Sequence, residues 1–157
     1  GRALNLITQI ENQEFRNVRT LKTAPVIANH VEKVREMGEM KGLSLETDLD
    51  ERHIMTIDPG LLDIMVRNLI KNAIRYSHPS TTIRIETDTN EIRVINRGDA
   101  SDFPEEDIFK RFRKGNKIRS LGLGLAIVKK ICEVSGLNID YQYSCGEHRF
   151  VITPFEE

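Results

Sequence analysis

The chain has 157 residues, the length of one domain that can bury a core of its own. Its 23 Lys and Arg against 24 Asp and Glu leave a net charge of −1, which argues against a global field that recruits nucleic acid or an anionic membrane. No run of eighteen apolar residues and no signal-peptide pattern occurs, so we expect this chain to neither span nor cross a bilayer. Cys132 and Cys145 lack metal-ligand spacing and are expected to be free thiols in a reducing cytoplasm.

The first third of the chain predicts two helices followed by two short strands. A narrow apolar stripe between Ala3 and about Val18 predicts a helix that pairs with something absent from this chain. A second helix is expected from Ala24 to Lys41, ending near Gly42. Alternating runs over 43–48 and 53–57 predict strands.

The centre of the chain predicts a capped helix and then a hairpin. Asp58 and Pro59 are typical of an N-cap and a first helical position, and the helix is expected to reach about Tyr76. Alternation over 82–87 and 91–96 predicts a β-hairpin.

The remainder predicts a short helix, a long helix and a second hairpin. The short helix is expected near Glu105 to Phe112, and the long one from about Gly122 to a left-handed cap at Gly136. Strands over 137–143 and 148–153 turn through 144–146. Hairpins with helices between them predict an α+β fold, a two-layer sandwich whose mixed, mostly antiparallel sheet is covered by helices on one face.

Four polar residues of the central helix share one side of it. At about 100° per residue, this polar strip borders the expected apolar stripe of Leu62, Val66, Leu69 and Ala73. Neutral amides placed there suit a cleft floor, since they can ligate a hard cation without repelling a triphosphate. Solvated asparagines would give the same spacing, and the residues alone do not decide. The strip consists of Asn68, Asn72, Arg75 and Tyr76.

Glycines and cations gather around the start of the last helix. Gly122 and Gly124 leave backbone N–H groups and the helix dipole open toward a phosphate. Six cations between Lys110 and Arg119 favour a mobile lid over such a ligand, although a solvated face has the same composition. No Walker A string occurs, and Ile127 breaks a G-x-G-x-x-G pattern, so P-loop and Rossmann sites are disfavoured.

Two strings together resemble the ATP-binding domain of histidine kinases, in the GHKL ATPase superfamily with its Bergerat-type fold. They are 68–77 (NLIKNAIRYS) and 120–130 (SLGLGLAIVKK), the latter followed by Ile131-Cys132. The resemblance implies that residues 21–157 are the ATP-binding catalytic domain. It also implies that residues 1–20 are the end of a dimerisation and phosphoacceptor helix.

The resemblance implies ATP and Mg²⁺ as ligands and assigns residues to them. Asn72 is expected to bind Mg²⁺, and Arg75 to act with it in catalysis at the phosphates. Ile108 to Phe112 resembles the family's phenylalanine box, and its phenylalanines would also suit core packing. Which of the six cations contacts phosphate stays open, with Lys114 included as a candidate. The expected nucleotide-binding residues are Asn68, Tyr76, Asn96, Gly98, Phe109, Lys114, Gly122, Leu123, Gly124 and Leu125.

One segment departs from the family pattern. Residues 94–100 stand where the family has Asp-x-Gly-x-Gly, with Asn96 in place of the aspartate that accepts from the adenine amine and Ala100 in place of the second glycine. An amide oxygen still accepts this bond, but loss of the charge weakens it by about 1 kcal/mol. Base selectivity is then also looser. The alternative is that Asp99 or Asp102 contacts the base from a shifted loop. Gly98 suits a close backbone approach to the ligand, or simply a turn after a strand.

The implied function is transfer of the γ-phosphoryl group of ATP to a histidine on an upstream dimerisation domain, and from there to a response regulator receiver domain. None of the four histidines lies in the family's His-Glu-x-x-x-x-Pro pattern, so all four are expected to be structural. We expect a homodimeric parent protein anchored in the bacterial inner membrane, a cytoplasmic fragment that can exist as a monomer, and no nucleic-acid partner. A nucleotide-weak pseudokinase scaffold and an anti-sigma-type serine kinase are the alternatives.

Overall fold

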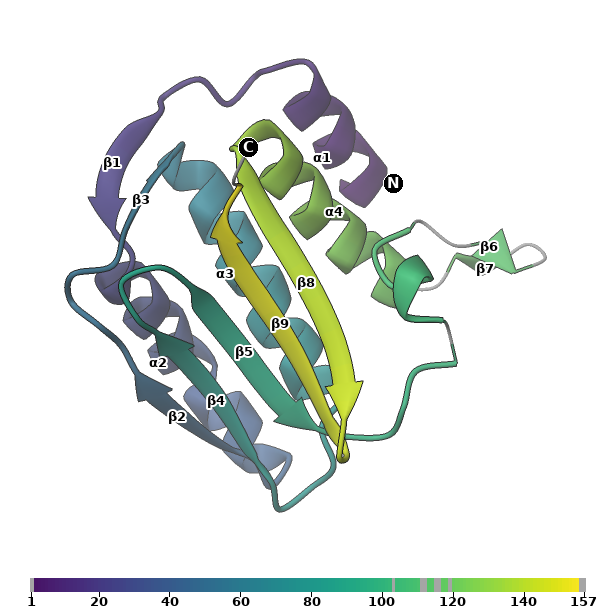
Figure 1. Cartoon of the computed structure of the whole chain (residues 1–157). Coiled ribbons are helices and arrows are strands. Elements are labelled where there is room, and N and C mark those ends of the chain that lie inside the picture. The colour runs from purple at the N-terminus through teal and green to yellow at the C-terminus, as the bar shows by residue number, and fades with distance from the viewer. Residues whose placement is uncertain (1, 103, 111–112, 115–116, 119, 156–157) are drawn as a thin grey trace.

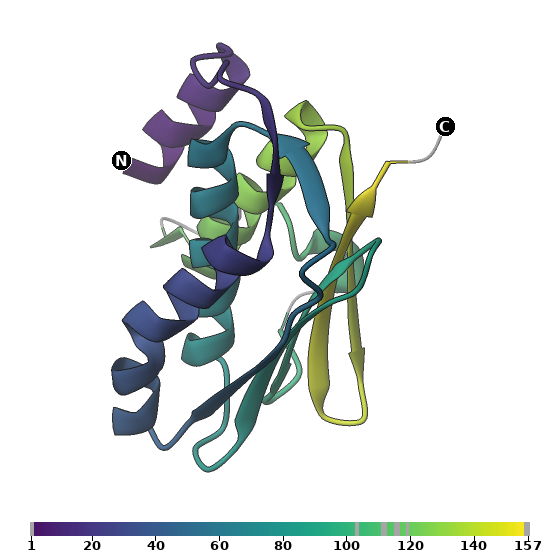
Figure 2. The same ribbon diagram turned by 90° about the vertical axis from the view of Figure 1, so that its left-hand side faces the viewer.

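The chain forms two layers, with helices on one side and a twisted sheet on the other (Figures 1 and 2). The computed structural model describes residues 2–102, 104–110, 113–114, 117–118 and 120–155. The α+β sandwich expected from the sequence is confirmed, including the covering of the sheet by helices on a single face.

The main sheet has five strands in the order β2-β4-β5-β9-β8. Strand β2 pairs in parallel with β4, and every other pairing in this sheet is antiparallel. Both expected hairpins are present, and the second turns at Cys145 and Gly146, whose φ angles of 53° and 78° define a type I′ turn. The strands are β2 (Ser44–Asp48), β4 (Thr82–Thr87), β5 (Ile92–Arg97), β8 (Leu137–Ser144) and β9 (Glu147–Pro154).

Three helices cover the sheet: α2 (Ala24–Met40), α3 (Pro59–Arg75) and α4 (Ser120–Val134). Helix α3 begins as expected, because Asp58 accepts from the backbone N–H groups of Gly60 and Leu61. Its apolar stripe is buried against β4, β5 and the neighbouring helices. Gly136 ends the α4 segment with a φ of 68°, the left-handed conformation predicted for it.

The N-terminal segment belongs to the same core. Helix α1 (Arg2–Glu11) packs on α4, where Ile7 and Ile10 are buried and Glu11 lies 3.7 Å from Lys130. The expectation of a helix reaching Val18 is wrong, since the helix ends at Glu11, and within this chain its apolar stripe packs on α4. Pairing with an element absent from this chain stays a prediction. The next residues form β1 (Arg19–Lys22), which pairs with β3 (Ile54–Ile57) and was not predicted.

The segment between β5 and α4 differs from the expectation. Over the described residues 104–110, a single 3₁₀ turn, η1 (Glu105–Asp107), stands in place of the predicted short helix, whose last residues, 111–112, lie outside the described ranges. Two short strands follow, β6 (Arg113–Lys114) and β7 (Lys117–Ile118), which pair with each other. Across the described ranges, no helix has the length and apolar character needed to cross a membrane.

Candidate nucleotide-binding site

The polar strip of α3 borders the buried face, as its spacing predicted. Asn68, Asn72 and Tyr76 are half-buried and Arg75 is exposed, with its guanidinium 5.6 Å from the centre of the Tyr76 ring. The Asn68 amide group donates to the carbonyl of Ile64 at 2.8 Å. This bond fixes the orientation of the side chain and leaves its oxygen directed toward α4.

Helices α3 and α4 run antiparallel, so the first turns of α4 lie beside the second half of α3. Met65 contacts Cys132 through their sulfur atoms at 3.9 Å, whereas Asn68, one turn further along α3, faces Gly124. A Cβ atom on residue 124 would lie 3.4 Å from the Asn68 Oδ1 atom. The positive end of the α4 dipole therefore lies next to the amides of α3.

The candidate residues of α4 separate into two kinds. Gly122, Leu123 and Gly124 lie in its first two turns, and because the helix begins at Ser120, only the N–H groups of its first four positions lack a partner within the helix. The side chain of Leu125 is 1% exposed and belongs to the core.

Asn96 lies at the end of β5 and is 1% exposed. Among the described residues, its Nδ2 atom has no hydrogen-bond partner. A buried donor without an acceptor costs about 1–3 kcal/mol, so such an atom indicates a water or ligand. Asn96 occupies the same face of the sheet as Val94, toward the helices, since alternate residues of a strand share a face.

Gly98 joins the end of β5 to the end of α3. A Cβ atom on residue 98 would lie 1.9 Å from the carbonyl oxygen of Tyr76, so the two backbones are in direct contact. The approach to a ligand expected from the sequence stays a prediction, whereas the close approach at Gly98 is made to the protein backbone. Asn96 and the polar strip of α3 are thereby held at the same end of the sandwich.

One phenylalanine of the phenylalanine box, Phe109, packs against the sheet. Phe109 meets Phe150 edge-on, with ring centres 6.0 Å apart, and the Lys129 ammonium lies 6.0 Å from its ring centre. Lys110 pairs with Asp107 at 2.8 Å, which raises the pKa of Lys110. Arg111, Phe112 and Arg119 lie outside the described residues, as do the side chains of Arg113, Lys114 and Lys117.

Each of the four histidines has a partner within the protein. His53 and His148 are buried, and burial lowers the pKa of both. His53 contacts the hydroxyl of Thr23 at 2.6 Å, while His30 and His78 contact Asp63 and Asp99. These contacts agree with the structural roles expected for all four.

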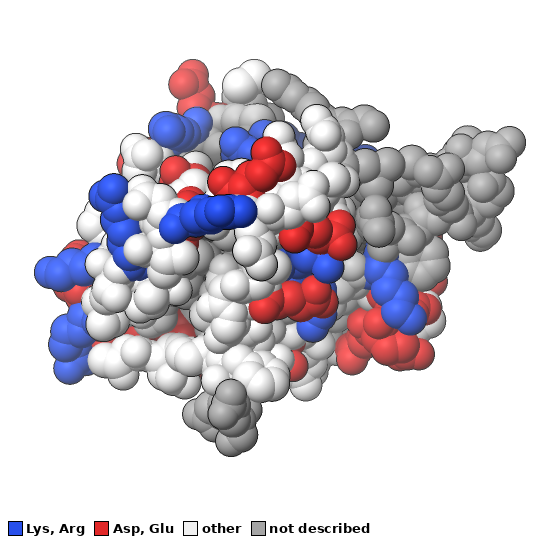
Figure 3. Space-filling model, turned by 90° about the horizontal axis from the view of Figure 1, so that it is seen from above, with Lys and Arg blue, Asp and Glu red and all other residues white. Residues whose placement is uncertain are grey.

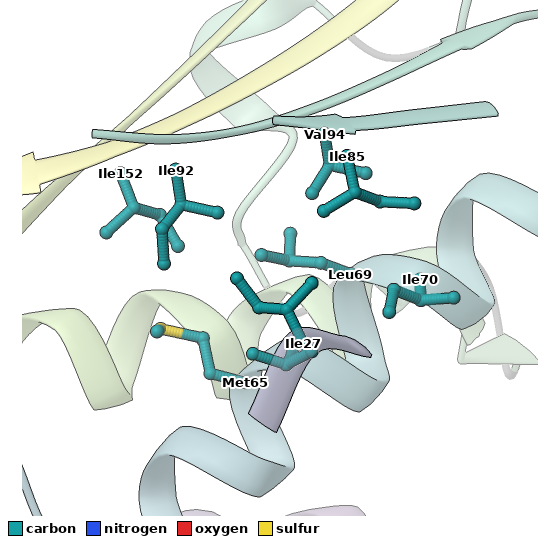
Figure 4. A pocket seen from close by; sticks show the side chains of 9 residues that line it. Ile27, Met65, Leu69, Ile70, Ile85, Ile92, Val94 and Ile152 are labelled. Atoms are coloured by element: carbon teal, nitrogen blue, oxygen red, sulfur yellow. The ribbon is translucent and has the colours of Figure 1, made fainter. Parts of the chain in front are cut away.

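An apolar cavity of about 10 Å³ lies between the sheet and the helices (Figure 4). Its lining includes Ile27 of α2, Met65 and Leu69 of α3, and Ile92 and Ile152 of the sheet. A cavity of this size without polar partners stays dry, so we assign it to core packing. Among the described residues on the face seen from above, acidic and basic side chains are interspersed (Figure 3).

The described residues contain no group of three His, Cys, Asp or Glu side chains that could hold a metal ion. The donors at the site are instead the amides of Asn68 and Asn72, one turn apart on α3. This donor set fits Mg²⁺ held jointly by the protein and by phosphate oxygens, because Mg²⁺ keeps few protein ligands beside phosphates.

Sequence reasoning missed Tyr143 and His148, which contact the backbone that follows Asn96. Alternation along the last hairpin is the signal that could have found them. It directs Tyr141, Tyr143 and His148 to the same face of the sheet as Asn96.

Comparison with known proteins identifies the class. Residues 57–156 match the family model described as histidine kinase-, DNA gyrase B-, and HSP90-like ATPase. The chain therefore belongs to this family, as an ATP-binding catalytic domain of the sensor histidine kinase type.

Relatives and solved structures agree with this assignment. The chain is 32% identical to the sensor histidine kinase HprS of Escherichia coli over 81% of its own length, and 29% identical to the sensor protein SrrB of Staphylococcus aureus over 94%. It spans only 29% and 28% of these two proteins. The Acinetobacter baumannii histidine kinase AdeS matches 99% of this chain and 77% of its own solved chain, with a TM-score of 0.78 and 25% identity.

Proposed function

We propose that this domain binds Mg-ATP and donates the γ-phosphoryl group to a histidine on an upstream dimerisation domain, from which a response regulator receiver domain takes it. The observation that carries the proposal is the antiparallel pairing of α3 and α4. It sets the amide of Asn68, on the polar strip of α3, against the first turns of α4 at Gly124. Amide oxygens beside a helix N-terminus combine cation ligation with phosphate binding.

In this proposal, each part of the site has one task. Asn72, supported by Asn68, holds the metal ion, and Arg75 contacts the phosphates. The backbone of Gly122, Leu123, Gly124 and Leu125 receives the phosphate oxygens, and the basic segment that includes Lys114 closes over them. Asn96 contacts the base, with Tyr76, Gly98 and Phe109 bordering it. Mg²⁺ held by Asn72 would neutralise the negative charge of the phosphates. The protein contributes position and charge, and no nucleophile of its own.

Calorimetric titration of ATP with and without Mg²⁺ tests the proposal. We expect Asn72→Ala to abolish the Mg²⁺-dependent part of the affinity. Asn29→Ala, an exposed asparagine on α2, is the matched control and should bind as the parent does. Unchanged affinity of Asn72→Ala would contradict the role given to Asn72, and no Mg²⁺-dependent binding by the parent chain would favour a pseudokinase scaffold.

Phosphotransfer in trans distinguishes the remaining alternative. Given an upstream helix pair that carries the His-Glu-x-x-x-x-Pro pattern, the domain should label the histidine, with an acid-labile phosphoramidate as product. A serine kinase of the anti-sigma type would instead form an acid-stable phosphoester on a partner protein. Residues 1–20 are proposed to continue from such a dimerisation helix in a homodimeric parent anchored in the bacterial inner membrane, with this domain in the cytoplasm.

A further inference from the structure

The end of the β8–β9 hairpin contacts the backbone that follows Asn96. The Tyr143 hydroxyl donates to the carbonyl of Gly98 at 2.9 Å, and the His148 Nε2 atom lies 2.7 Å from the carbonyl oxygen of Asp99. The Gly98 N–H group donates to the carbonyl of Gly146 at 3.2 Å. Three hydrogen bonds from one hairpin therefore hold two consecutive residues.

The protonation state of His148 follows from these partners. A backbone carbonyl only accepts, so the Nε2 atom must carry the hydrogen. In a neutral ring the Nδ1 atom is then an acceptor, and the Tyr141 hydroxyl lies 2.7 Å from it as the donor. Burial lowers the pKa of His148, which agrees with a neutral ring. His148 thus acts as a donor of fixed orientation.

Packing leaves these side chains little freedom. The Tyr143 and His148 ring centres are 4.7 Å apart, and those of Tyr141 and His148 are 5.9 Å apart. His148 stands opposite both Asn96 on β5 and Tyr143 on β8. Directly opposed residues of an antiparallel sheet place their side chains on the same face, so Tyr143 and His148 share the face that bears the buried amide of Asn96.

We propose that Tyr143 and His148 are positioning residues for recognition of the nucleotide base. They hold the carbonyls of Gly98 and Asp99, and through this backbone they direct the Asn96 amide at the base. This inference rests on the proposed function, in which Asn96 contacts the base. In this inference, neither Tyr143 nor His148 contacts the nucleotide.

Substitutions that remove one hydrogen-bonding group test the inference by calorimetric titration with Mg-ATP. Tyr143→Phe removes the donor to Gly98 and should weaken binding about three- to tenfold, the effect of one neutral hydrogen bond. Gln142→Ala, at an exposed position of the same strand whose side chain lies on the opposite face, is the control and should stay within about twofold of the parent. His148→Gln keeps an N–H donor and should bind more tightly than His148→Ala.

A double-mutant cycle separates positioning from a general structural effect. If Tyr143 acts through the Asn96 segment, Tyr143→Phe should weaken binding less than about twofold when Asn96 is already alanine. An equal loss in both backgrounds, or no loss in the parent background, overturns the inference. If Tyr143→Phe does not fold, the Mg-ATP affinities of His148→Gln and His148→Ala are compared instead. The difference between these two variants should be smaller when residue 96 is alanine than when it is asparagine.

The outcomes also distinguish this inference from the proposed function. A parent protein that binds no Mg-ATP overturns both. A parent that binds Mg-ATP together with a Tyr143→Phe variant of equal affinity overturns only the positioning role.

Discussion

The carbonyl oxygen of Tyr76 occupies the position that a side chain on Gly98 would need, 1.9 Å from its ideal Cβ atom. This contact joins the last turn of α3 to the end of β5. It brings the polar strip and Asn96 into one region, although 20 residues of chain separate Tyr76 from Asn96. The arrangement of the candidate site therefore depends on a position that has no side chain.

Gly98→Ala is accordingly expected to be damaging. The atom that must give way is backbone, so the two elements have to separate, and overpacking of this kind costs about 1–3 kcal/mol or more. For a domain of this size the melting temperature should fall by about 3–10 °C, and Mg-ATP affinity should fall with it. Thermal unfolding and titration measure both effects. A variant with the parent's stability and affinity would show that the contact is absent in solution.

Gly124→Ala should have opposite effects on stability and on binding. A helical glycine replaced by alanine stabilises a protein by about 0.5–1 kcal/mol, and the 3.4 Å contact with the Asn68 oxygen is ordinary. The added methyl group nevertheless lies between α4 and the amide of α3, so Mg-ATP should bind several-fold more weakly.

Gly38→Ala is the control for this effect, as a helical glycine on α2 whose added Cβ would meet the flexible end of Leu45. Its stability can change in either direction, but its affinity for Mg-ATP should not. If Gly124→Ala binds Mg-ATP as tightly as the parent or more tightly, residue 124 does not lie at the ligand site.

The sequence predicts the main elements well because their signals are local. The Asp58 cap, the apolar stripe of α3 and the alternation over 82–87 each depend on neighbouring residues, and each is present in the structure. Strand β1 and the docking of Ile7 and Ile10 depend on surfaces distant in the sequence, and local patterns do not contain them. The hydrogen bond that Glu105 accepts from the Tyr143 backbone N–H group on the hairpin is another long-range contact that local patterns do not contain.

The candidate site likewise has a part that local sequence patterns predict and a part that they do not. Asn68, Asn72 and the glycines of α4 can be recognised in the sequence, because each group lies within one continuous helix. The contact of Gly98 with Tyr76, and the hydrogen bonds from Tyr143 and His148, join separate elements and become visible only when the sheet is assembled.

Asn96→Asp is expected to tighten ATP binding about fivefold. A carboxylate accepts from the base amine with a charge-assisted bond, worth on the order of 1 kcal/mol more than the bond to an amide oxygen. Without nucleotide the same carboxylate is buried at a position that is 1% exposed, so the ligand-free variant should melt at a lower temperature than the parent. Tighter ATP binding together with a lower melting temperature distinguishes this effect from general damage to the protein, which would lower both affinity and melting temperature.

Asn90→Asp, at the exposed turn between β4 and β5, is the matched control and should leave Mg-ATP affinity unchanged. Equal or weaker binding of ATP by Asn96→Asp would reject the alignment of residues 94–100 with the family's base-binding segment. Titration with GTP beside ATP measures whether the substitution also sharpens base selectivity.

The docking of α1 on α4 predicts that residues before the ATP-binding segment stabilise the domain. Ile10 is 2% exposed, and replacing such a side chain with alanine costs about 2–5 kcal/mol, so Ile10→Ala should lower the melting temperature by about 5–15 °C. Asn5→Ala, at an exposed position of the same helix, should change it little. A change below about 1 °C for Ile10→Ala would mean that α1 is detached in solution.

Stability should fall as the pH drops below about 6.5, because of His53 and His148. Burial lowers the pKa of both from the ordinary value of 6.5, so the unfolded chain binds protons in a range where the folded chain does not. Their contribution is complete above 6.5 and is lost as the pH falls through the folded-state pKa values. Asp50 and Asp88 oppose the lowering of the pKa of His53, and Asp99 opposes that of His148, without reversing either.

Urea unfolding at pH 7.5 and at pH 5.5 measures this effect. Both pH values lie above the range in which Asp50 titrates, because Arg52 lowers the pKa of Asp50 to about 2. The free energy of unfolding should be smaller at pH 5.5, and this difference should shrink in a variant that carries both His53→Gln and His148→Gln. A parent protein of equal stability at the two pH values would show that neither ring resists protonation.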